Sequence, residues 1–483
     1  MTVQSFKAHL GGAWIGSGDE IDVHDPADWT KVIGRVPALN AAQVTTAFEG
    51  ARVGAGIWGA TNPIERGRVL FRAAGLLRER SETLALLLSR ENGKTVAEAT
   101  VEVAKAADFF EYFAGFGRQP LGEIVADERS GTVTTVRHEP VGVVLAITPW
   151  NDPLLTPARK MAPALAMGNS VVLKPASDTP MIAIELTRVL LEAGLPPEVI
   201  TTVTGKASEI AEALVASPEI DAITFTGSTE VGLAVHRQVA GRNLRVQCEM
   251  GGKNAAIVLA DADIELAAQT IAAAAFAQGG QRCTATSRVL VEPSVKEALI
   301  ARLVEHALAM SAGRGSDEGT TLGPLVNPHH QMDVLDHVAT AIGEGARVRA
   351  GGTRPVDGTL SDGCFVLPTI LDEVTTDMSV WSTEIFGPVV AVVGCGSLAE
   401  AVKIANDSDY GLSASLFTSS LAATDEFLRG INTGQAAVNL PTSGWDVHQP
   451  FGGFKLSGSP FKEQGHDALG FYTRTKTCAV RSI

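Results

Sequence analysis

The feature that most constrains this chain is a regular alternation of short apolar segments and longer helical patterns, which begins near residue 141. Val141–Ile147 is apolar along its length, as expected of a parallel strand that is buried on both faces. A helical pattern then ends at Gly168–Asn169. Further apolar segments follow, separated by helical patterns, at 171–173, 199–203, 222–225 and 244–247. This order predicts a doubly wound parallel sheet with helices on both faces.

The alternation restarts after Gly251–Gly252, which predicts a second α/β domain. We expect its first strands at 255–259 and 288–291 and its first helices at 263–277 and 294–309. Before residue 118 the periodicity is helical, and Thr61 or Asn62 is placed to cap a helix that begins with Pro63. Ser81 is placed to cap the next helix.

Composition narrows the class of protein further. The 483 residues correspond to roughly three domains of ~150 residues, and 45% hydrophobic with 19% charged residues argues against a disordered chain. The net charge of −15 disfavours nucleic acid and anionic membranes as partners, and no apolar stretch approaches the ~20 residues of a membrane helix. Met1–Leu10 lacks the features of a signal peptide. We therefore expect a cytoplasmic protein.

The cysteine pattern indicates reduced thiols and no metal site. The count is odd, and no pair has the C-x-x-C spacing. His329–His330 is most simply a solvated loop pair. The cysteines are Cys248, Cys283, Cys364, Cys395 and Cys478.

Two glycine-containing segments are candidates for chemistry. Phe225–Gly232 joins a predicted strand to a predicted helix, so its backbone amides could bind a phosphate, although a plain strand–helix connection is also open. Cys283 lies in a glycine-rich loop beside Arg282, and a nearby cation favours the reactive thiolate. The alternative is that Cys283 is a small buried hydrophobic residue.

Two polar side chains follow predicted buried strands. Glu249 ends a strand just before two glycines, where it could act as a general base or form a salt bridge at the sheet edge. Asn151 ends another strand, where its amide could stabilise an oxyanion or close a local Asx turn.

In combination these segments resemble the aldehyde dehydrogenase superfamily, over nearly everything from about residue 10 to the end. Seven motifs in the right order make accidental similarity negligible. They are Thr148-Pro-Trp-Asn151, Leu173-Lys-Pro-Ala, Phe225-Thr-Gly-Ser-Thr-Glu-Val-Gly232, Glu249-Met-Gly-Gly-Lys, Gly280-Gln-Arg-Cys283-Thr, Glu384-Ile-Phe-Gly-Pro388 and Pro450-Phe-Gly-Gly-Phe-Lys455.

The resemblance implies two doubly wound parallel-sheet domains, one Rossmann-like for the cofactor and one catalytic, with a small β oligomerisation element. Relatives pair through that element, so it implies a homodimer or homotetramer. The implied boundaries are 1–118 and 141–251 for the cofactor domain, 119–140 for a hairpin, 252–449 for the catalytic domain, 450–466 for a return segment and 467–483 for an oligomerisation strand.

The resemblance also implies a reaction and its residues. Cys283 would be the nucleophile, Glu249 the base, and Asn151 would share the oxyanion hole with the backbone N–H of Cys283. Lys160 and Glu463 match positions thought to assist proton movement. An aldehyde would be oxidised to a carboxylic acid through a thiohemiacetal and a thioester, with hydride transfer to NAD or NADP.

The implied cofactor site contains one departure from many NAD-preferring relatives. They have Glu where this chain has Ser177, and without that carboxylate a 2′-phosphate is not repelled, which predicts NADP or dual use. The implied cofactor residues are Ile147, Thr148, Trp150, Lys174, Ser177, Gly227, Ser228, Glu384 and Phe386.

The implied substrate pocket is polar. Asp152 replaces a common Phe, and Arg159 matches an Arg of semialdehyde dehydrogenases, although their second Arg is Ala277 here. We expect a small polar or anionic aldehyde, 2-oxoglutarate semialdehyde ahead of succinate semialdehyde, with Trp445 and His448 at the tunnel mouth. Asp152 and Arg159 could instead pair with each other. A coenzyme A-acylating enzyme and a non-catalytic family member are alternative functions.

Overall fold

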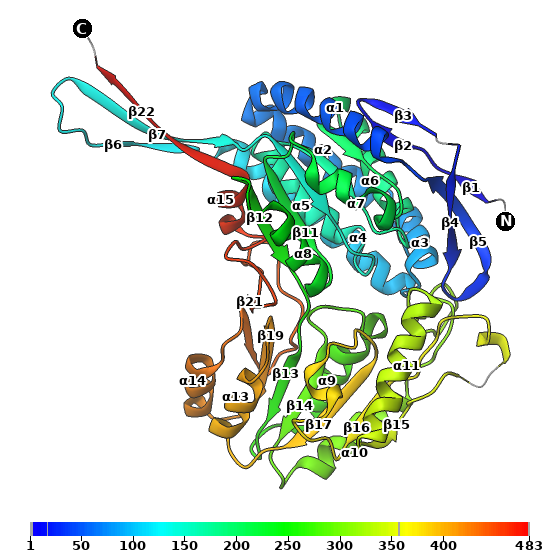
Figure 1. The fold of residues 1–483 in the computed structure, drawn as a ribbon. Helices are drawn as coiled ribbons and strands as arrows, with labels where there is room; N and C mark the ends of the chain where they lie inside the picture. The colour runs from blue at the N-terminus through cyan, green and yellow to red at the C-terminus, as the bar shows by residue number, and fades with distance from the viewer. Residues whose placement is uncertain (1–2, 17, 356–357, 482–483) are drawn as a thin grey trace.

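The computed structural model describes residues 3–16, 18–355 and 358–481. In these residues two sheets of seven strands each form the centres of two lobes, and an arm of strands projects from the first lobe (Figure 1). The predicted α/β fold with parallel sheets is confirmed.

The first lobe is built on a sheet with the strand order β12-β11-β8-β9-β10-β2-β3. The five strands from β12 to β10 are parallel, and β2 and β3 add antiparallel pairs at one edge. Every residue of β9 is buried, as expected for a strand covered on both faces. The strands are β2 (Ala8–Leu10), β3 (Ala13–Ile15), β8 (Val143–Ile147), β9 (Ser170–Lys174), β10 (Ile200–Thr202), β11 (Ala222–Thr226) and β12 (Arg245–Glu249).

Helices cover this sheet and pack against one another above it. Asn62 is the N-cap of α2, and its side chain accepts a hydrogen bond from the backbone N–H of Ile64. The predicted cap at Ser81 is wrong, because Ser81 is already the first residue of α3 and Arg80 holds the cap position. The helices are α1 (Ala41–Ala60), α2 (Pro63–Glu79), α3 (Ser81–Asn92), α4 (Val96–Ala114), η1 (Gly115–Arg118), α5 (Leu155–Ala166), α6 (Met181–Glu192), η2 (Pro197–Val199), α7 (Ala207–Ala216) and α8 (Thr229–Val239).

A small N-terminal sheet, which the sequence analysis did not predict, lies beside the first lobe. Its strands are β1 (Gln4–Ser5), β4 (Glu20–Asp25) and β5 (Asp28–Pro37), in the order β1-β5-β4. Phe6 and Val36 bury their side chains in a cluster that includes Met181 of α6.

The second lobe is built on a sheet with the order β15-β16-β17-β14-β13-β19-β20, parallel except at β15. Apolar clusters occupy both of its faces. Its elements are β13 (Asn254–Val258), α9 (Ile264–Phe276), η3 (Ala277–Gly280), β14 (Thr286–Val291), α10 (Lys296–Leu308), α11 (Pro328–Gly343), β15 (Arg347–Ala350), η4 (Gly358–Leu360), β16 (Thr369–Asp372), α12 (Ser379–Ser382), β17 (Val389–Gly394), α13 (Leu398–Asn406), β19 (Ser413–Phe417), α14 (Leu421–Gly430) and β20 (Gln435–Val438).

The arm extends away from both lobes (Figure 1). Its strands are β6 (Gly122–Val125), β7 (Thr132–Pro140) and β22 (Thr473–Arg481), and β7 pairs antiparallel with β6 and β22. Two short helices, η5 (His466–Ala468) and α15 (Leu469–Tyr472), lead into β22. Ile124, Val133 and Val480 expose their apolar side chains on this arm.

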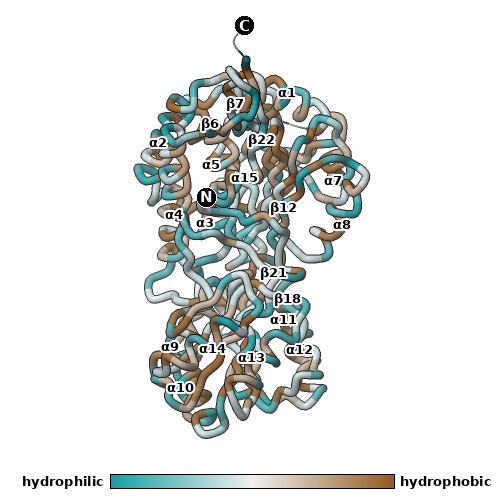
Figure 2. The backbone as a smooth tube through the Cα atoms, turned by 90° about the vertical axis from the view of Figure 1, so that its left-hand side faces the viewer, coloured by the Kyte–Doolittle hydropathy of each residue, from teal (hydrophilic) through white to brown (hydrophobic). Residues whose placement is uncertain are grey.

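The chain enters and leaves the second lobe through two segments that lie side by side. It enters after Glu249, which forms a β-bridge with Gly458, and the N–H of Met250 donates to the carbonyl of Ser457 at 2.9 Å. The returning segment also pairs β21 (Phe454–Lys455) with β18 (Tyr410–Gly411). Figure 2 shows β18 and β21 at the junction between the lobes. No helix in the described ranges is long and apolar enough to cross a membrane.

Candidate active site

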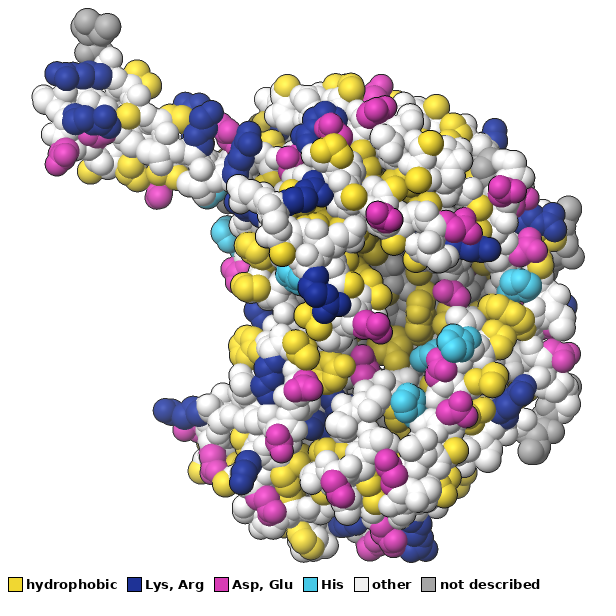
Figure 3. All heavy atoms as spheres, viewed as in Figure 1, with side chains coloured by type: hydrophobic (Ala, Val, Ile, Leu, Met, Phe, Trp, Pro, Cys, Tyr) yellow, Lys and Arg dark blue, Asp and Glu magenta, His cyan; other side chains and the backbone are white. Residues whose placement is uncertain are grey.

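A cavity of 740 Å³ lies between the two lobes and brings together most of the residues singled out in the sequence. Figure 3 shows this hollow, with acidic and histidine side chains at its rim. The first lobe lines it with α4, α5 and the loop after β8, and the second lobe with α11 and the loop before β14. The predicted site residues that line it are Trp150, Asn151, Asp152, Arg159, Gly227, Ser228, Glu249, Cys283, Glu384, Phe386 and Trp445.

Cys283 lies in a turn between η3 and β14. Gln278, Gly279 and Gly280 precede it with left-handed φ angles of 54°, 64° and 70°, and this conformation is strained for Gln278. Burial raises the pKa of the Cys283 thiol to about 12, and Arg159 is the strongest charge that opposes this shift.

The cation beside Cys283 is therefore not the one that the sequence predicted. The guanidinium of Arg282 donates from Nε to the side-chain oxygen of Gln278 at 2.9 Å. The sequence predicts that Arg282 is the cation near the thiol, but this cation is Arg159. Arg159 is 124 positions before Cys283 in the chain. Burial has a larger effect on the pKa of Cys283 than the charge of Arg159, so it disfavours the expected thiolate.

Asn151 lies in the loop after β8 and is buried. Its side-chain amide donates to the backbone carbonyl of Gln281 at 3.0 Å, across the cavity from its own loop. This bond joins the two lobes and is not the local Asx turn that the sequence left open. A primary amide has a second N–H, which can donate to an oxygen in the cavity.

Glu249 ends β12 with only 3% of its surface exposed. Both carboxylate oxygens are buried, and neither has a hydrogen-bond partner among the described residues. Burial, and then the charge of Glu463, raise the pKa of Glu249 well above its usual range, against the opposing effect of Lys160 and Arg159. The alternative of a salt-bridged residue is not what the described residues show.

A buried ion pair lies behind Glu249. Glu463 pairs with Lys160, and both side chains are inaccessible to solvent. The ammonium of Lys160 also donates to the hydroxyl of Thr224 at 2.9 Å. Arg159 approaches Glu463 from the cavity side, at 3.3 Å between Nη1 and Oε2. Arg159, Glu463 and Lys160 thus form a series of alternating charges that extends from the cavity into the first lobe.

Arg159 lies on α5 between two aromatic rings. Its guanidinium carbon is 4.8 Å from the ring centre of Phe451 and 5.6 Å from that of Phe109. Its Nε is buried and has no partner among the described residues. Asp152 instead contacts Lys94 at 3.3 Å, and in the described ranges it forms no ion pair with Arg159. The possibility that Asp152 and Arg159 pair with each other is therefore wrong.

The cavity wall opposite Arg159 carries acidic and aromatic groups. Glu384 accepts a hydrogen bond from the N–H of Gly252 at 2.8 Å, and burial raises its pKa to about 7. A Cβ on Gly251 would lie 2.0 Å from the same carboxylate, so a larger residue there would displace the side chain of Glu384. Phe386 packs edge-on against Trp150, with ring centres 5.4 Å apart.

The remaining cofactor residues lie at the carboxyl ends of β8 and β9, outside the cavity lining. Lys174 ends β9, donates to the carbonyl of Pro175 at 2.6 Å, and has its pKa lowered to about 8 by burial. The hydroxyl of Ser177 donates to the carbonyl of Gly205 at 3.0 Å. Ile147 ends β8, and Thr148 donates its backbone N–H to the carbonyl of Lys174.

These residues fit a dinucleotide. The carboxyl ends of parallel strands are where such cofactors bind, and Ser228 stands at the N-cap of α8 with no capping bond from its side chain. The ammonium of Lys174 has further N–H bonds for ribose hydroxyls, and Glu384 offers a carboxylate acceptor.

One prediction about histidines is wrong, and another stays a prediction. His448 is exposed near Asp446 and is not among the residues that line the cavity, so its place at the tunnel mouth stays a prediction. His330, which the sequence predicts to be half of a solvated loop pair, lies on α11 and lines the cavity. Its Nε2 is 2.9 Å from the carbonyl oxygen of Phe386, and its ring centre is 5.3 Å from that of Trp150. A helical pattern that starts at Pro328 could have predicted that His330 lies on the packed face of a helix.

Comparison with known proteins gives consistent matches over the whole chain. Residues 14–478 match the family model described as "Aldehyde dehydrogenase family". The chain is 36% identical to the alpha-ketoglutaric semialdehyde dehydrogenase of Bacillus subtilis (strain 168), over 98% of this chain and 97% of that protein. It is 39% identical to the alpha-ketoglutarate semialdehyde dehydrogenase of Haloferax volcanii, over 98% of each.

A solved structure has the same fold. The betaine aldehyde dehydrogenase of Staphylococcus aureus in complex with NAD+ superposes with a TM-score of 0.96 at 32% identity, covering 99% of this chain and 95% of that one. In the described residues no cluster of three or more His, Cys, Asp or Glu side chains is arranged to hold a metal ion.

Proposed function

The chain belongs to the aldehyde dehydrogenase family, and on this premise we propose that its substrate is a small aldehyde that carries a carboxylate, such as 2-oxoglutarate semialdehyde. As a member of the family it is an NAD(P)-dependent oxidoreductase that converts an aldehyde to a carboxylic acid through a cysteine thiohemiacetal and thioester. The observation that carries the proposal is a cavity in which Cys283 and Arg159 face the same space.

Cys283 is the nucleophile in this proposal. Its thiol must lose its proton before it adds to the aldehyde carbon, and the positive charge of Arg159 favours the thiolate. The aldehyde oxygen then becomes an oxyanion. It accepts hydrogen bonds from the second side-chain N–H of Asn151 and from the backbone N–H of Cys283. A donor of this kind is worth roughly 3 to 4 kcal/mol in a comparable site.

Glu249 is the base that activates water against the thioester. A carboxylate with a raised pKa is a better proton acceptor, and its unpartnered oxygens leave room for a water. Glu463 and Lys160 lie behind it as a charged pair that can relay a proton. Because hydrolysis uses water, NAD(P)H is expected to form without added coenzyme A.

We keep the roles that the resemblance implies for the cofactor residues as part of the proposal. Glu384 and Phe386 bind the nicotinamide ribose and ring, and Trp150 lines the cofactor cleft. Lys174 binds the adenosine ribose and Ser228 the pyrophosphate. When bound, NAD(P) supplies the ring that accepts the hydride from the thiohemiacetal. Ser177 carries no charge that would repel a 2′-phosphate, which supports NADP or dual use.

Arg159 recognises the carboxylate of the substrate. Its guanidinium lies against Phe109 and Phe451, its Nε has no partner within the described ranges, and its ion pair with Glu463 measures 3.3 Å. A guanidinium with an unused N–H is suited to a carboxylate. The names of the similar proteins, which act on alpha-ketoglutarate semialdehyde, support this class of substrate.

The test is Arg159→Met, which removes the charge but keeps an apolar stem between the rings. Arg159 also faces Cys283 and Glu463, so kcat/KM should fall for every aldehyde. The proposal predicts an additional loss of about 30-fold for 2-oxoglutarate semialdehyde relative to propanal, the equivalent of about 2 kcal/mol. Steady-state kinetics with both aldehydes measures the difference.

Lys105→Met is the matched control. Lys105 also lines the cavity, but it pairs with Asp446 at 3.0 Å near the entrance. The control should reduce kcat/KM for both aldehydes by similar factors. Equal losses in Arg159→Met, or a selective loss only in Lys105→Met, would remove Arg159 from substrate recognition.

We also propose that the chain forms a homodimer or homotetramer through the arm, in a reducing compartment such as the cytoplasm. The exposed edge of β22 and the apolar side chains of Ile124, Val133 and Val480 support the first proposal. The free thiols of all five cysteines in the described chain support the second.

A further inference from the structure

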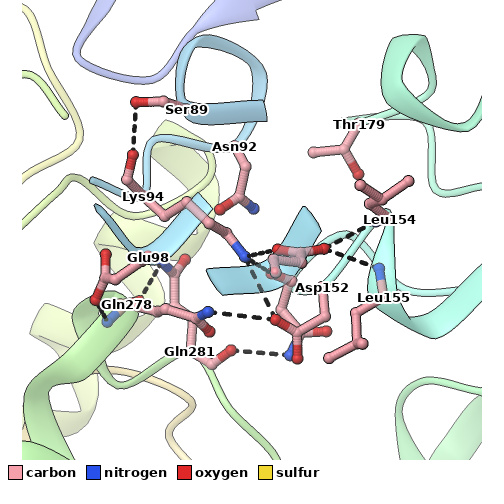
Figure 4. A network of polar contacts seen from close by, with 12 residues as sticks. Ser89, Asn92, Lys94, Glu98, Asp152, Leu154, Leu155, Thr179, Gln278 and Gln281 are labelled. Carbon is pink, nitrogen blue, oxygen red and sulfur yellow. Dashed lines mark hydrogen bonds and ion pairs between the residues drawn. The ribbon is translucent and has the colours of Figure 1, made fainter. Parts of the chain in front are cut away.

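The buried Lys94 makes contacts that no role described above requires. It lies between α3 and α4, with only 1% of its side chain exposed, and it does not line the cavity. Figure 4 shows its ammonium at the centre of a network of acceptors. Placing an unpaired ammonium in a protein interior is costly, so these contacts decide whether the charge is tolerated.

Three acceptors surround the ammonium of Lys94. It pairs with the carboxylate of Glu102 on α4, donates to the backbone carbonyl of Asn151 at 2.8 Å, and lies 3.3 Å from the carboxylate of Asp152. Burial opposes the charge, but Glu102 and Asp152 outweigh it and raise the pKa of Lys94. An ammonium has three N–H bonds, so this one is fully occupied.

Glu102 binds the C-terminal end of the loop after β8, which contains Asn151. Its second oxygen accepts the backbone N–H groups of Leu154 and Leu155, at 2.9 and 3.0 Å. Asn92 donates to the carbonyl of Trp150 at 2.8 Å. Both ends of the loop from Trp150 to Leu155 are thus tied to α3, α4 and the junction between them (Figure 4).

Asp152 extends the network to the second lobe. It accepts a hydrogen bond from the side-chain amide of Gln278 at 3.3 Å, and the backbone N–H of Gln278 donates to Glu98 at 2.7 Å. Gln278 is the non-glycine residue with φ of 54° in the turn before Cys283. Strain of this kind persists when surrounding contacts hold the residue.

We propose that Lys94 is a positioning residue that, with Glu102 and Asp152, holds the Asn151 loop at the correct distance from the Cys283 turn. Its ammonium donates to the backbone carbonyl of Asn151, while the side-chain amide of Asn151 faces the reacting oxygen. Asp152 then links the two lobes in addition to lining the cavity. The inference rests on the proposed role of Asn151 in the oxyanion hole.

The test is Lys94→Met, together with the double variant Lys94→Met/Glu102→Gln, which removes the orphaned buried carboxylate. We expect kcat for aldehyde oxidation to fall about 10- to 100-fold in both, with KM little changed, because a small displacement of an oxyanion donor lowers the rate without weakening substrate binding. The double variant should recover the melting temperature without recovering kcat.

A second readout separates the oxyanion hole from the nucleophile. Alkylation of Cys283 by iodoacetamide displaces iodide and forms no oxyanion, so its rate should stay within about twofold of wild type. In an Asn151→Ala background, Lys94→Met should cause no further loss of kcat, because coupled residues are not additive. Peptide mass spectrometry assigns the alkylated cysteine.

Lys296→Met is the matched control, since Lys296 pairs with Asp372 at 2.7 Å far from the cavity. It should keep wild-type kcat. Recovery of kcat together with stability in the double variant, or additive losses with Asn151→Ala, would overturn the inference alone. An Asn151→Ala variant with unchanged kcat would remove the proposed oxyanion role, and this inference with it.

Discussion

Glu249 shows how a single residue can trade stability for reactivity. It is buried and has no hydrogen-bond partner among the residues that the structure describes, so its ionised form is costly in the folded protein. Burial is the larger cause of the raised pKa of Glu249, and the charge of Glu463 is the second. A base that must accept a proton from water benefits from the same raised pKa that penalises the fold.

Replacing Glu249 by Gln should therefore stabilise the protein in a pH-dependent way. Because the folded-state pKa is raised, the wild type has no penalty below the unfolded pKa of about 4.3 and loses stability as pH rises towards the folded pKa. The neutral variant has no such loss. Its melting temperature should thus exceed that of wild type by an amount that grows over this window, while its kcat falls.

Melting curves and kcat measured across the same pH range provide the check. The wild-type kcat should rise along a limb that lies above the ordinary carboxylic range, and the limb should be missing in Glu249→Gln. A melting-temperature difference that is the same at every pH would contradict the assignment of the shift to Glu249.

The sequence allowed prediction of the candidate catalytic residues and, through the resemblance, of Arg159, Lys160 and Glu463, but not of the contacts that the charged groups make. Cys283, Glu249 and Asn151 each follow a strand or a glycine-rich turn, which is a local signal. Arg159 and Lys94 act on partners far away in the chain, and a lysine is normally predicted to be exposed. Long-range charge pairing leaves no periodic pattern, so Arg282 was chosen wrongly for its sequence proximity.

At the scale of elements, the helices and strands with strong periodicity were predictable and the short ones were not. The buried strand β8 is apolar throughout, and β9 and β11 are buried strands in which apolar residues predominate. In contrast, β5 mixes exposed and buried positions without a clear period, and the alternation of β4 covers only six residues. Tertiary packing against α6 decides their conformation.

The arm supports a prediction about association. If β22 and its exposed side chains form the interface between copies, Val133→Glu combined with Val480→Glu should place charges in it and reduce the molecular mass in solution. Light scattering after size exclusion measures the mass. Leu421→Glu is the control, because Leu421 is 86% exposed on the second lobe and should not affect association. A monomeric wild type, or an unchanged mass in the double variant, would count against the arm.

At the scale of the molecule, ligand binding between the lobes should report cofactor choice. A ligand that binds only the folded state stabilises it by about 2.7 kcal/mol at 100 times its dissociation constant. We therefore expect both NAD and NADP to raise the melting temperature. Ser177→Glu should abolish the shift with NADP and keep the shift with NAD, because a carboxylate repels a 2′-phosphate.

The matched substitution is Ser177→Gln, which adds similar bulk without charge and should leave both shifts in place. Kinetics give an independent check. A preference of about 100-fold for NAD in the wild-type enzyme, equivalent to roughly 2.7 kcal/mol, would contradict dual use.

The two segments that connect the lobes have a mechanical consequence. Glu249 ends β12 and is paired with Gly458 across these two segments, so the base is fixed at the junction itself. Cys283 is carried by the second lobe, and contacts between the lobes, such as the bond from Asn151 to the carbonyl of Gln281, hold it beside the first. The separation of thiol and base therefore depends on these contacts as well as on the two connecting segments.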